Sequence, residues 1–331
     1  MPRRFLTIGI GVPLIALLMH NYLTSWLFFQ GSHIICLFEW NDLLPSTSVQ
    51  DCKRNDEVEN TSPTTNERAS TRSSIQQSVV SILFNEKWQK QSDLEKYQFY
   101  VFSFFSWIVT MVPTSTISMT LMYAGITLRI LQFMPTFPKA TKQSIHIMQS
   151  TQHYQFGLVY ISVGFHFLLQ ICQEGGPIHI GYLLFIVWMS DTGALILGRL
   201  MRKKTGATTE SMEIQQQWLF QSFLKSISPG KTMPGLAGAM ITGPVSAILY
   251  PIDMSGSNIS ILSFTSHLSQ KVVLGLVLSI VGIIGDLAES SVKRMSGKKD
   301  SGGLLPGHGG VVDRFDSLFT AGTVYYYLVL A

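Results

Sequence analysis

Eight or nine long apolar runs dominate this chain and limit the folds that it can adopt. They occupy approximately residues 5–20, 22–38, 98–113, 115–133, 155–172, 178–198, 233–252, 268–287 and 316–331. A helix of about 20 apolar residues crosses the hydrocarbon layer of a bilayer with its backbone polar groups paired internally. Charged residues make up only 13% of the 331 residues, about half the fraction of an ordinary soluble domain. The sequence therefore predicts an all-α integral membrane protein, a polytopic bundle of eight or nine transmembrane helices.

Lysine and arginine concentrate in alternate loops between these runs. The loops at 39–97, 134–154, 199–232 and 288–315 hold most of the 24 basic residues, and the turns near 21, 114, 173–177 and 253–267 hold none. Positively charged loops stay on the cytoplasmic side of a membrane. We therefore expect the N-terminus inside, the C-terminus outside and every candidate catalytic loop on the cytoplasmic side. The first run, which follows Arg3 and Arg4, is interpreted as a retained helix rather than a signal peptide.

The predicted organisation has three parts: N-terminal membrane helices at 1–40, a polar insert at 41–97, and the main membrane-embedded domain at 98–331. Ser, Thr, Asn, Gln and mixed charges dominate 45–78, which is interpreted as disordered because it cannot bury enough apolar surface. Residues 79–97 mix apolar side chains with Lys and Gln, as in an interfacial helix or in a poorly ordered lead into the next span. Residues 209–226 are open to the same two interpretations, an interfacial helix or a poorly ordered segment.

The overall charge indicates which partners to expect, and the cysteine positions indicate whether disulfides or a cysteine metal site are present. The formal net charge is +4, and the bases flank apolar helices rather than forming a patch interleaved with aromatic residues. We therefore expect contact with anionic lipid headgroups and none with nucleic acid. The three cysteines lie far apart in the sequence and predict neither a disulfide framework nor a metal site.

Acidic residues cluster at the end of the eighth apolar run and just before the ninth. Asp286, Lys293 and either Glu289 or Ser290 recur at three- and four-residue spacing, so they share one face if the helix continues. An acid at the membrane boundary is a functional candidate by default, although a structural ion pair of Asp286 with Lys293 is the alternative. Another pair of acids follows in the sequence Asp-Arg-Phe-Asp.

These later acids, Asp313 and Asp316, lie three residues apart, on one face of a helix that begins there. Together with Asp286 they supply hard oxygen ligands of the kind that Mg²⁺ accepts while it binds substrate phosphates. The glycines at 306–310 allow main-chain amides to approach phosphate oxygens. Basic side chains strengthen this interpretation through charge-assisted contacts with phosphates; they are Lys293, Arg294, Lys298, Lys299 and Arg314. His308 either bonds a phosphate or braces the loop.

Residues 290–316 read Ser-x-Val-Lys-Arg, four residues, Lys-Asp, five residues, Pro-Gly-His-Gly-Gly, two residues, Asp-Arg-Phe-Asp. This pattern resembles the signature of the phosphatidate cytidylyltransferase family, also called CDP-diacylglycerol synthases. Two further motifs resemble the same family: Asp-Thr-Gly-Ala from Asp191 with a later Gly-Arg, and Ser-Pro-x-Lys-Thr at 228–232. The chain departs from the family after Thr232, where it has Met233-Pro234 in place of an apolar or aromatic residue followed by Glu.

The resemblance implies that CMP is transferred from CTP to phosphatidate, giving CDP-diacylglycerol and pyrophosphate for phospholipid biosynthesis. We assign catalytic roles to Asp286, Lys293, Asp313 and Asp316, of which Asp286, Asp313 and Asp316 would bind Mg²⁺, alone or with a second cation. The residues expected to contact the substrates are Asp191, Arg199, Ser228, Lys231, Thr232, Arg294, Lys299, Asp300, His308 and Arg314. For Asp191 the alternative is a packing role, with Ala194 and Gly198 marking a small-residue helix face.

The resemblance also implies a multi-pass integral membrane location and a homodimer. The family occurs in bacterial inner membranes, plastids and the endoplasmic reticulum, and we find no signal in the sequence that selects among them. One alternative function is a different CTP-dependent enzyme acting on a prenyl lipid, such as a CDP-archaeol synthase or a polyprenol kinase. The other is a transporter in which Asp191 and Asp286 line an ion path, although a transporter does not account for the long polar loop.

Overall fold

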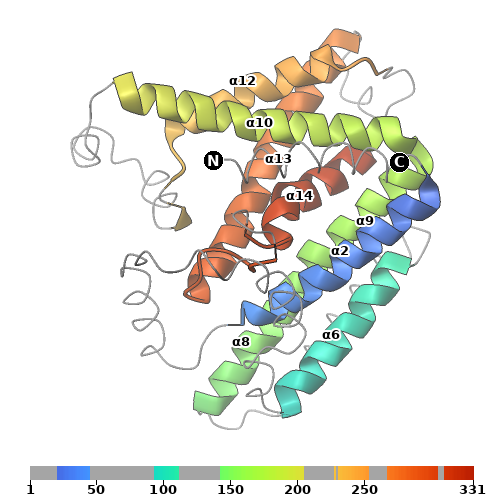
Figure 1. Cartoon of the computed structure of the whole chain (residues 1–331), viewed down its shortest axis with the longest axis vertical. Helices are drawn as coiled ribbons and strands as arrows, with labels where there is room; N and C mark the ends of the chain where they lie inside the picture. The colour runs from blue at the N-terminus through green and yellow to red at the C-terminus, as the bar shows by residue number, and fades with distance from the viewer. Residues whose placement is uncertain are drawn as a thin grey trace, which may run out of the picture. The chain divides into compact units, whose positions relative to one another are not determined.

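The computed structural model describes residues 21–44, 93–111, 142–204, 227–228, 230–252, 267–304 and 309–331 (Figure 1). Within these ranges every regular element is a helix. The helical elements are α2 (Tyr22–Asp42), α6 (Asp93–Met111), α8 (Lys142–Gly157), η3 (Leu158–Ser162), α9 (Val163–Gln170), η4 (Ile171–Gly175), α10 (Gly176–Lys204), α12 (Met233–Leu249), α13 (His267–Met295) and α14 (Val312–Val329). The apolar runs at 5–20 and 115–133, the insert at 45–78 and the segment at 209–226 lie outside the described residues.

The other seven predicted apolar runs all coincide with described helices. Two helical stretches, Met148–Met201 with 54 residues and His267–Met295 with 29, are long and apolar enough to cross a membrane by length and composition. The first of them turns at Gly176, whose φ of 68° lies in the left-handed region that suits a residue without Cβ. This break lies within the turn predicted at 173–177, and the all-helical prediction holds for the part of the chain described.

The chain forms two compact units, each assembled from segments that are distant in the sequence. Unit 1 combines residues up to His166 with Val292–Arg314, and unit 2 combines Phe167–Ser291 with Phe315–Ala331. Helices α13 and α14 each contribute residues to both units. The boundaries predicted after residues 40 and 97 remain predictions.

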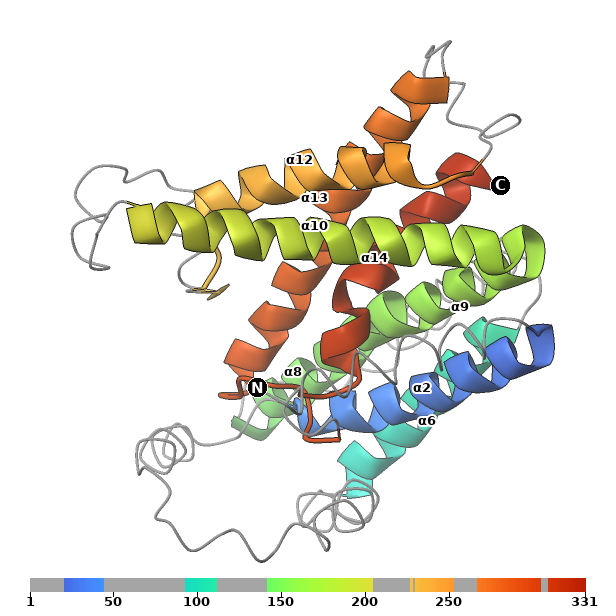
Figure 2. The same ribbon diagram turned by 45° about the horizontal axis from the view of Figure 1, so that its top comes forward.

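In unit 1, α8 and η3 contact both α2 and α6 (Figures 1 and 2). Trp40 near the end of α2 is fully buried, and its indole Nε1 donates to the His153 carbonyl at 3.1 Å. His153 Nε2 donates in return to the Trp40 carbonyl at 2.7 Å, and the two rings stack with centroids 4.9 Å apart. The Tyr154 hydroxyl donates to Asn41 Oδ1 at 2.6 Å. These buried hydrogen bonds satisfy polar groups inside the unit and hold the C-terminal end of α2 in place.

In unit 2, α10 and α12 lie along one another, as both views show (Figures 1 and 2). Small residues allow this close approach. A Cβ atom at Gly238 would lie 2.5 Å from the Gly193 carbonyl oxygen, and one at Gly235 would lie 3.1 Å from the Ala194 carbonyl oxygen. Gly198 also faces the first turn of α12. This stretch of α10 is therefore a helix-packing face, in line with the packing alternative considered for Ala194 and Gly198.

Helix α13 packs against α12 and α14 through another stripe of small residues. A Cβ atom at Gly275 would lie 2.6 Å from the Gly243 carbonyl oxygen of α12. Further along α13, a Cβ atom at Gly285 would lie 2.6 Å from the Asp316 carbonyl oxygen of α14. Thr320 of α14 also donates to a main-chain carbonyl of α13 at 3.0 Å. The small residues thus bring the backbones of these helices together and position the acidic side chains that follow.

Candidate active site

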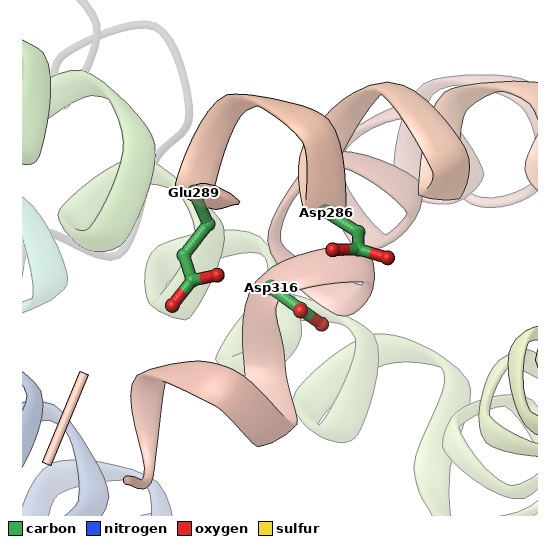
Figure 3. A group of neighbouring side chains, drawn as sticks. All are labelled: Asp286, Glu289 and Asp316. Atoms are coloured by element: carbon green, nitrogen blue, oxygen red, sulfur yellow. The ribbon is translucent and has the colours of Figure 1, made fainter. Parts of the chain in front are cut away.

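Three carboxylates meet between α13 and α14 (Figure 3). Asp286 and Glu289 come from α13 and Asp316 comes from α14, and one oxygen of each lies within 4.8 Å of the others. Glu289 is fully buried, and the two aspartates are partly buried. Like charges at this separation repel one another, so a cation beside them is stabilising. We call Asp286, Glu289 and Asp316 the carboxylate cluster.

The geometry of the carboxylate cluster follows from local sequence. Asp286 and Glu289 are three residues apart, so they lie on the same face of α13. Gly285 precedes Asp286 and is the point at which the α14 backbone comes closest, because any side chain there would collide with Asp316 and Thr320. The glycine therefore brings the acid on α14 within reach of the two acids on α13.

A lysine that precedes α12 lies beside the carboxylate cluster. Lys231 Nζ is 2.6 Å from Asp286 Oδ2, and the two side chains are 19% and 30% exposed. Ser290 Oγ also donates to Asp286 Oδ1 at 3.3 Å. The structure therefore pairs Asp286 with Lys231, not with Lys293 as in the structural ion pair considered above. The ammonium nitrogen is itself buried, although the rest of the side chain is partly exposed, and it offsets part of the negative charge of the cluster.

The start of α12 accommodates the Met233-Pro234 sequence. Thr232, rather than Ser228, caps this helix, and its Oγ1 accepts the Gly235 N–H at 3.2 Å. Met233 and Pro234 form the first turn of α12, where a backbone N–H has no intrahelical acceptor and proline is tolerated. Pro234 therefore costs the helix no hydrogen bond. The Lys231 N–H donates to the Ser228 carbonyl at 3.1 Å, which closes the turn before the helix.

Unit 1 contains a second group of charged residues, centred on Asp313 near the start of α14. Lys293 Nζ lies 2.6 Å from Asp313 Oδ1. Asp313 Oδ2 accepts three hydrogen bonds: from the Ser301 N–H at 3.0 Å, the Ser301 hydroxyl at 3.0 Å and the Gly310 N–H at 2.7 Å. We call residues 296–311 the signature loop. Asp313 thus joins the end of α13, the signature loop and the first turn of α14.

A buried glutamate from α2 completes this group. Glu39 is only 1% exposed, and its Oε1 accepts the Val311 N–H at 2.9 Å. Its Oε2 accepts the Val312 N–H at 2.9 Å and the Ser301 hydroxyl at 3.1 Å. Burial raises the pKa of Glu39 above its usual value, although the hydrogen bonds from Val312, Val311 and Ser301 oppose that shift. The N-terminus of α14 and the signature loop are therefore both held by one side chain of α2.

The end of α2 holds the signature loop at two further points. The Ser296 hydroxyl donates to the Leu43 carbonyl, and Lys298 Nζ donates to the Asp42 carbonyl at 3.0 Å. A cation at the C-terminus of a helix interacts favourably with the last carbonyl groups. Lys298, which the sequence suggested as a phosphate ligand, here binds the C-terminal end of α2.

The remaining predicted site residues differ in their exposure to solvent. Asp191 and Arg199 are exposed on α10, and Ser228 and Thr232 are partly buried. The exposed residues of the signature loop and its flanks include Arg294, Lys299, Asp300 and Arg314. His308 lies outside the described residues. Their roles in substrate binding remain predictions.

Sequence reasoning did not assign roles to Glu39, Glu289 or Ser301. A signal existed for Glu289, because its spacing of three from Asp286 places both on one helix face. Glu39 follows directly on the apolar run at 22–38, but its partners lie 262 to 273 residues later in the chain. Of the three predicted metal ligands, Asp286 and Asp316 lie in the carboxylate cluster, and Asp313 is paired with Lys293.

Comparison with known proteins finds one matching family and several relatives that all have the same name. The model of the cytidylyltransferase family matches residues 75–211 and 219–331. Proteins named phosphatidate cytidylyltransferase from Staphylococcus saprophyticus and Staphylococcus aureus are each 37% identical to this chain, over 163 and 162 residues. The one from Staphylococcus haemolyticus is 36% identical over 160 residues. Each alignment covers 48% of this chain and 52% of the relative, so the chain spans about half the length of the curated relatives it matches.

The family match includes α6, the helices from α8 to α10, and all of α12, α13 and α14 with the signature loop. It therefore contains the carboxylate cluster and the Lys293–Asp313 pair. Because the match extends over well more than half of the 331 residues, the chain belongs to the cytidylyltransferase family.

Proposed function

We propose that this protein transfers CMP from CTP to phosphatidate, producing CDP-diacylglycerol and pyrophosphate. A phosphate oxygen of phosphatidate would form a bond with the α-phosphorus of CTP, and the bond from that phosphorus to the bridging oxygen of the β-phosphate would break. The family membership and the names of the relatives support this reaction. The observation that carries the proposal is the carboxylate cluster with Lys231 beside it. The carboxylates could hold a metal cation, and this cation and Lys231 would supply the positive charge that both anionic substrates require.

The donor atoms of the carboxylate cluster suit Mg²⁺. All three side chains offer carboxylate oxygens, and these lie within 4.8 Å of one another. Mg²⁺ prefers oxygen ligands and commonly binds through a few carboxylates together with water and substrate phosphates. A bound Mg²⁺ would neutralise negative charge on the triphosphate and on the leaving pyrophosphate. We propose Asp286 and Asp316 as ligands, as the sequence suggested, and add Glu289.

The side chains of the protein would bind and orient the two anionic substrates. A phosphate monoester is nucleophilic near neutral pH, so the reaction requires positioning and charge neutralisation rather than a serine or cysteine nucleophile. Lys231 is partly exposed beside Asp286 and would contact a phosphate oxygen of CTP. Lys293 would do the same for the second phosphate group, with Asp313 fixing the position of its ammonium group. Arg294 and Arg314 are exposed and would add further charge-assisted contacts.

A location in a membrane would bring the lipid substrate to this site. We propose the nine-span topology with the N-terminus and the catalytic loops on the cytoplasmic side, and a homodimer as the family resemblance implies. Several apolar side chains on α10, α12 and α13 are more than half exposed, as contact with lipid requires; they include Leu195, Ile241, Leu249 and Ile284. The acyl tails of phosphatidate would then remain in the bilayer while the headgroup meets CTP.

Incorporation of label from α-labelled CTP into a chloroform-extractable lipid tests this reaction. Purified membranes with phosphatidate and Mg²⁺ should give a labelled lipid, and EDTA should abolish it. The same assay with a prenyl phosphate in place of phosphatidate tests CMP transfer to an isoprenoid acceptor, and γ-labelled CTP with a prenol tests kinase activity. Product formed with the prenyl lipid and none with phosphatidate, in a folded protein, would overturn the proposal.

A further inference from the structure

Glu39 belongs to α2, outside the motifs that resemble the family signature and before the residues that the family model matches. Among the described residues, its carboxylate nevertheless makes all of its hydrogen bonds to the signature loop and the start of α14. We infer that Glu39 is a positioning residue for CMP transfer, which acts through Ser301 on Asp313 and Lys293. This inference rests on the proposed function.

The contacts form a continuous series from α2 to the Lys293–Asp313 pair. Glu39 Oε2 is 3.1 Å from Ser301 Oγ, and Ser301 Oγ is 3.0 Å from Asp313 Oδ2. A serine hydroxyl has one hydrogen, so it is shared between the two carboxylates. The Ser301 backbone N–H also binds Asp313, and Asp313 in turn holds Lys293 at 2.6 Å. A displacement of Glu39 would therefore be transmitted to the ammonium group of Lys293.

The glycines of the signature loop provide an independent observation. A Cβ atom at Gly302 would lie 2.6 Å from Glu39 Oε1, and a Cβ atom at Gly310 would lie 2.5 Å from Glu39 Oε2. Both distances are shorter than an ordinary carbon–oxygen contact. By contrast, a Cβ atom at Gly303 would have no neighbour within 4 Å. Two glycines of this loop are thus needed to make room for a carboxylate of the protein itself.

The backbone of α14 provides the second half of the interaction. Val311 and Val312 present N–H groups that no residue of the same helix can accept, because they lie at the N-terminus. Glu39 accepts one with each oxygen, both at 2.9 Å. A glutamine keeps the shape of the side chain but has only one acceptor oxygen, so one N–H would then face an NH₂ group. Glu39→Gln therefore disturbs the start of α14 with minimal change of volume.

Kinetics of folded variants distinguish positioning from simple stabilisation. Glu39→Gln should lower kcat for CMP transfer by about 10²-fold, the effect of a small misplacement of reacting groups. Its KM for CTP should stay within about twofold, because an interaction needed mainly in the transition state changes kcat rather than KM. The matched control is Tyr154→Phe, which removes another buried hydrogen bond to α2 without touching the signature loop. It should keep kcat within about twofold at a similar loss of thermal stability.

A double-variant test uses the glycine contact. Gly302→Ala alone should lower kcat, whereas Gly303→Ala should not. In a Glu39→Ala background, Gly302→Ala should have much less effect, since the oxygen that it collides with is absent. Equal effects of Gly302→Ala in both backgrounds would contradict the inference, because coupled residues show non-additive changes.

Hydrogen exchange gives a result that does not depend on activity. Glu39→Gln should speed amide exchange of the peptide covering residues 309–313, and Tyr154→Phe should not. If the wild-type protein transfers no CMP, the proposed function fails while this exchange test still decides whether Glu39 holds the loop. If the wild type is active and Glu39→Gln keeps its kcat and its slow exchange, the inference about Glu39 is overturned.

Discussion

The acids of the carboxylate cluster are chemically alike but have different surroundings. Asp286 has an ammonium group and a hydroxyl as partners, and Asp316 Oδ1 accepts the N–H of Ser317 at 2.6 Å. Glu289 is fully buried, where an ionised carboxylate is costly without a compensating charge. At the scale of single residues, we therefore expect the acids to differ in their response to neutral substitution. Substitution by the corresponding amide keeps the shape and removes the charge.

Neutralising an acid of the cluster should weaken metal binding. For Asp316→Asn, the Mg²⁺ concentration that gives half-maximal CMP transfer should rise by about tenfold or more, because a metal site is sensitive to its ligands and their immediate partners. An Mg²⁺ titration at saturating CTP measures this change. Asp93→Asn, at an exposed acid in the first turn of α6, is the control and should leave the titration unchanged. An unchanged curve for Asp316→Asn would exclude a metal at this cluster.

Asp313 requires the same titration for a different reason. Its oxygens already accept from Lys293, Ser301 and Gly310, so a metal ligand role would require some of these bonds to open. If Asp313 binds the metal, as the sequence suggested, Asp313→Asn should shift the Mg²⁺ titration as Asp316→Asn does. If it serves to fix Lys293, the variant should lower kcat by about 10²-fold, the cost of a small misplacement, at an unchanged Mg²⁺ requirement.

Lys231 should contribute mainly to nucleotide binding and turnover. Lys231→Met removes the ammonium group beside Asp286 and should lower kcat/KM for CTP by about 10²-fold, similar to the loss of one stabilising charge or donor. Lys231→Arg keeps the charge and should recover part of the activity. The control Lys96→Met, in α6, should leave kcat/KM unaltered. Wild-type kcat/KM in Lys231→Met would contradict a phosphate-binding role.

At the scale of helices, the structure depends on how closely backbones approach. Gly285 has the Asp316 carbonyl 2.6 Å from the position of an added Cβ, whereas at Gly282 the nearest atom would be 3.6 Å away. These two glycines lie one turn apart on α13 and face the same helix, α14. Substituting each glycine in turn therefore distinguishes the effect of overpacking between the helices from the effect of replacing a glycine.

Alanine at these two positions should have opposite effects. Gly285→Ala should force α14 away and destabilise the protein by about 1–3 kcal/mol, as overpacking does, with a large loss of activity because Asp286 and Asp316 separate. Gly282→Ala should be neutral or stabilise by about 0.4–1 kcal/mol through reduced freedom of the unfolded chain. Thermal unfolding and CMP transfer of both variants in detergent check this. Equal stability of the two variants would contradict the observed packing.

The helices themselves were predictable because an apolar run is a local feature of the sequence. The positions of α12 and α13 follow from their length and composition, and Asp286 with Glu289 follows from helical spacing. The contacts of Glu39 were not predictable in this way, because its partners lie at least 262 residues away. Periodicity also cannot show which cation pairs with which acid, so the Lys231–Asp286 and Lys293–Asp313 pairs emerged only in the folded structure.

At the scale of the whole molecule, the proposed membrane topology decides whether the candidate site would meet CTP. The sequence contains two glycosylation sequons, Asn60-Thr61-Ser62 and Asn258-Ile259-Ser260. The predicted topology places Asn60 on the cytoplasmic side and Asn258 on the opposite side. The distribution of basic residues is the basis of both assignments.

Expression in a host with a secretory pathway tests this orientation. Asn60 should carry no glycan, and any glycan should depend on Asn258. Mobility shifts before and after glycosidase treatment, compared between Asn60→Gln and Asn258→Gln proteins, measure this. A glycan lost specifically in Asn60→Gln would reverse the orientation and place the catalytic loops on the wrong side for cytoplasmic CTP.

The long sequence separation between Glu39 and its partners also affects the order of events during synthesis. Val312 follows Glu39 by 273 residues. At about 5–20 residues per second, roughly 14 to 55 s pass between the translation of Glu39 and that of Val312, whose N–H group it accepts. During this time the carboxylate must stay in water or carry a proton, because burying a lone charge is costly. The signature loop and the start of α14, rather than α2 itself, therefore determine when α2 can reach its final buried position.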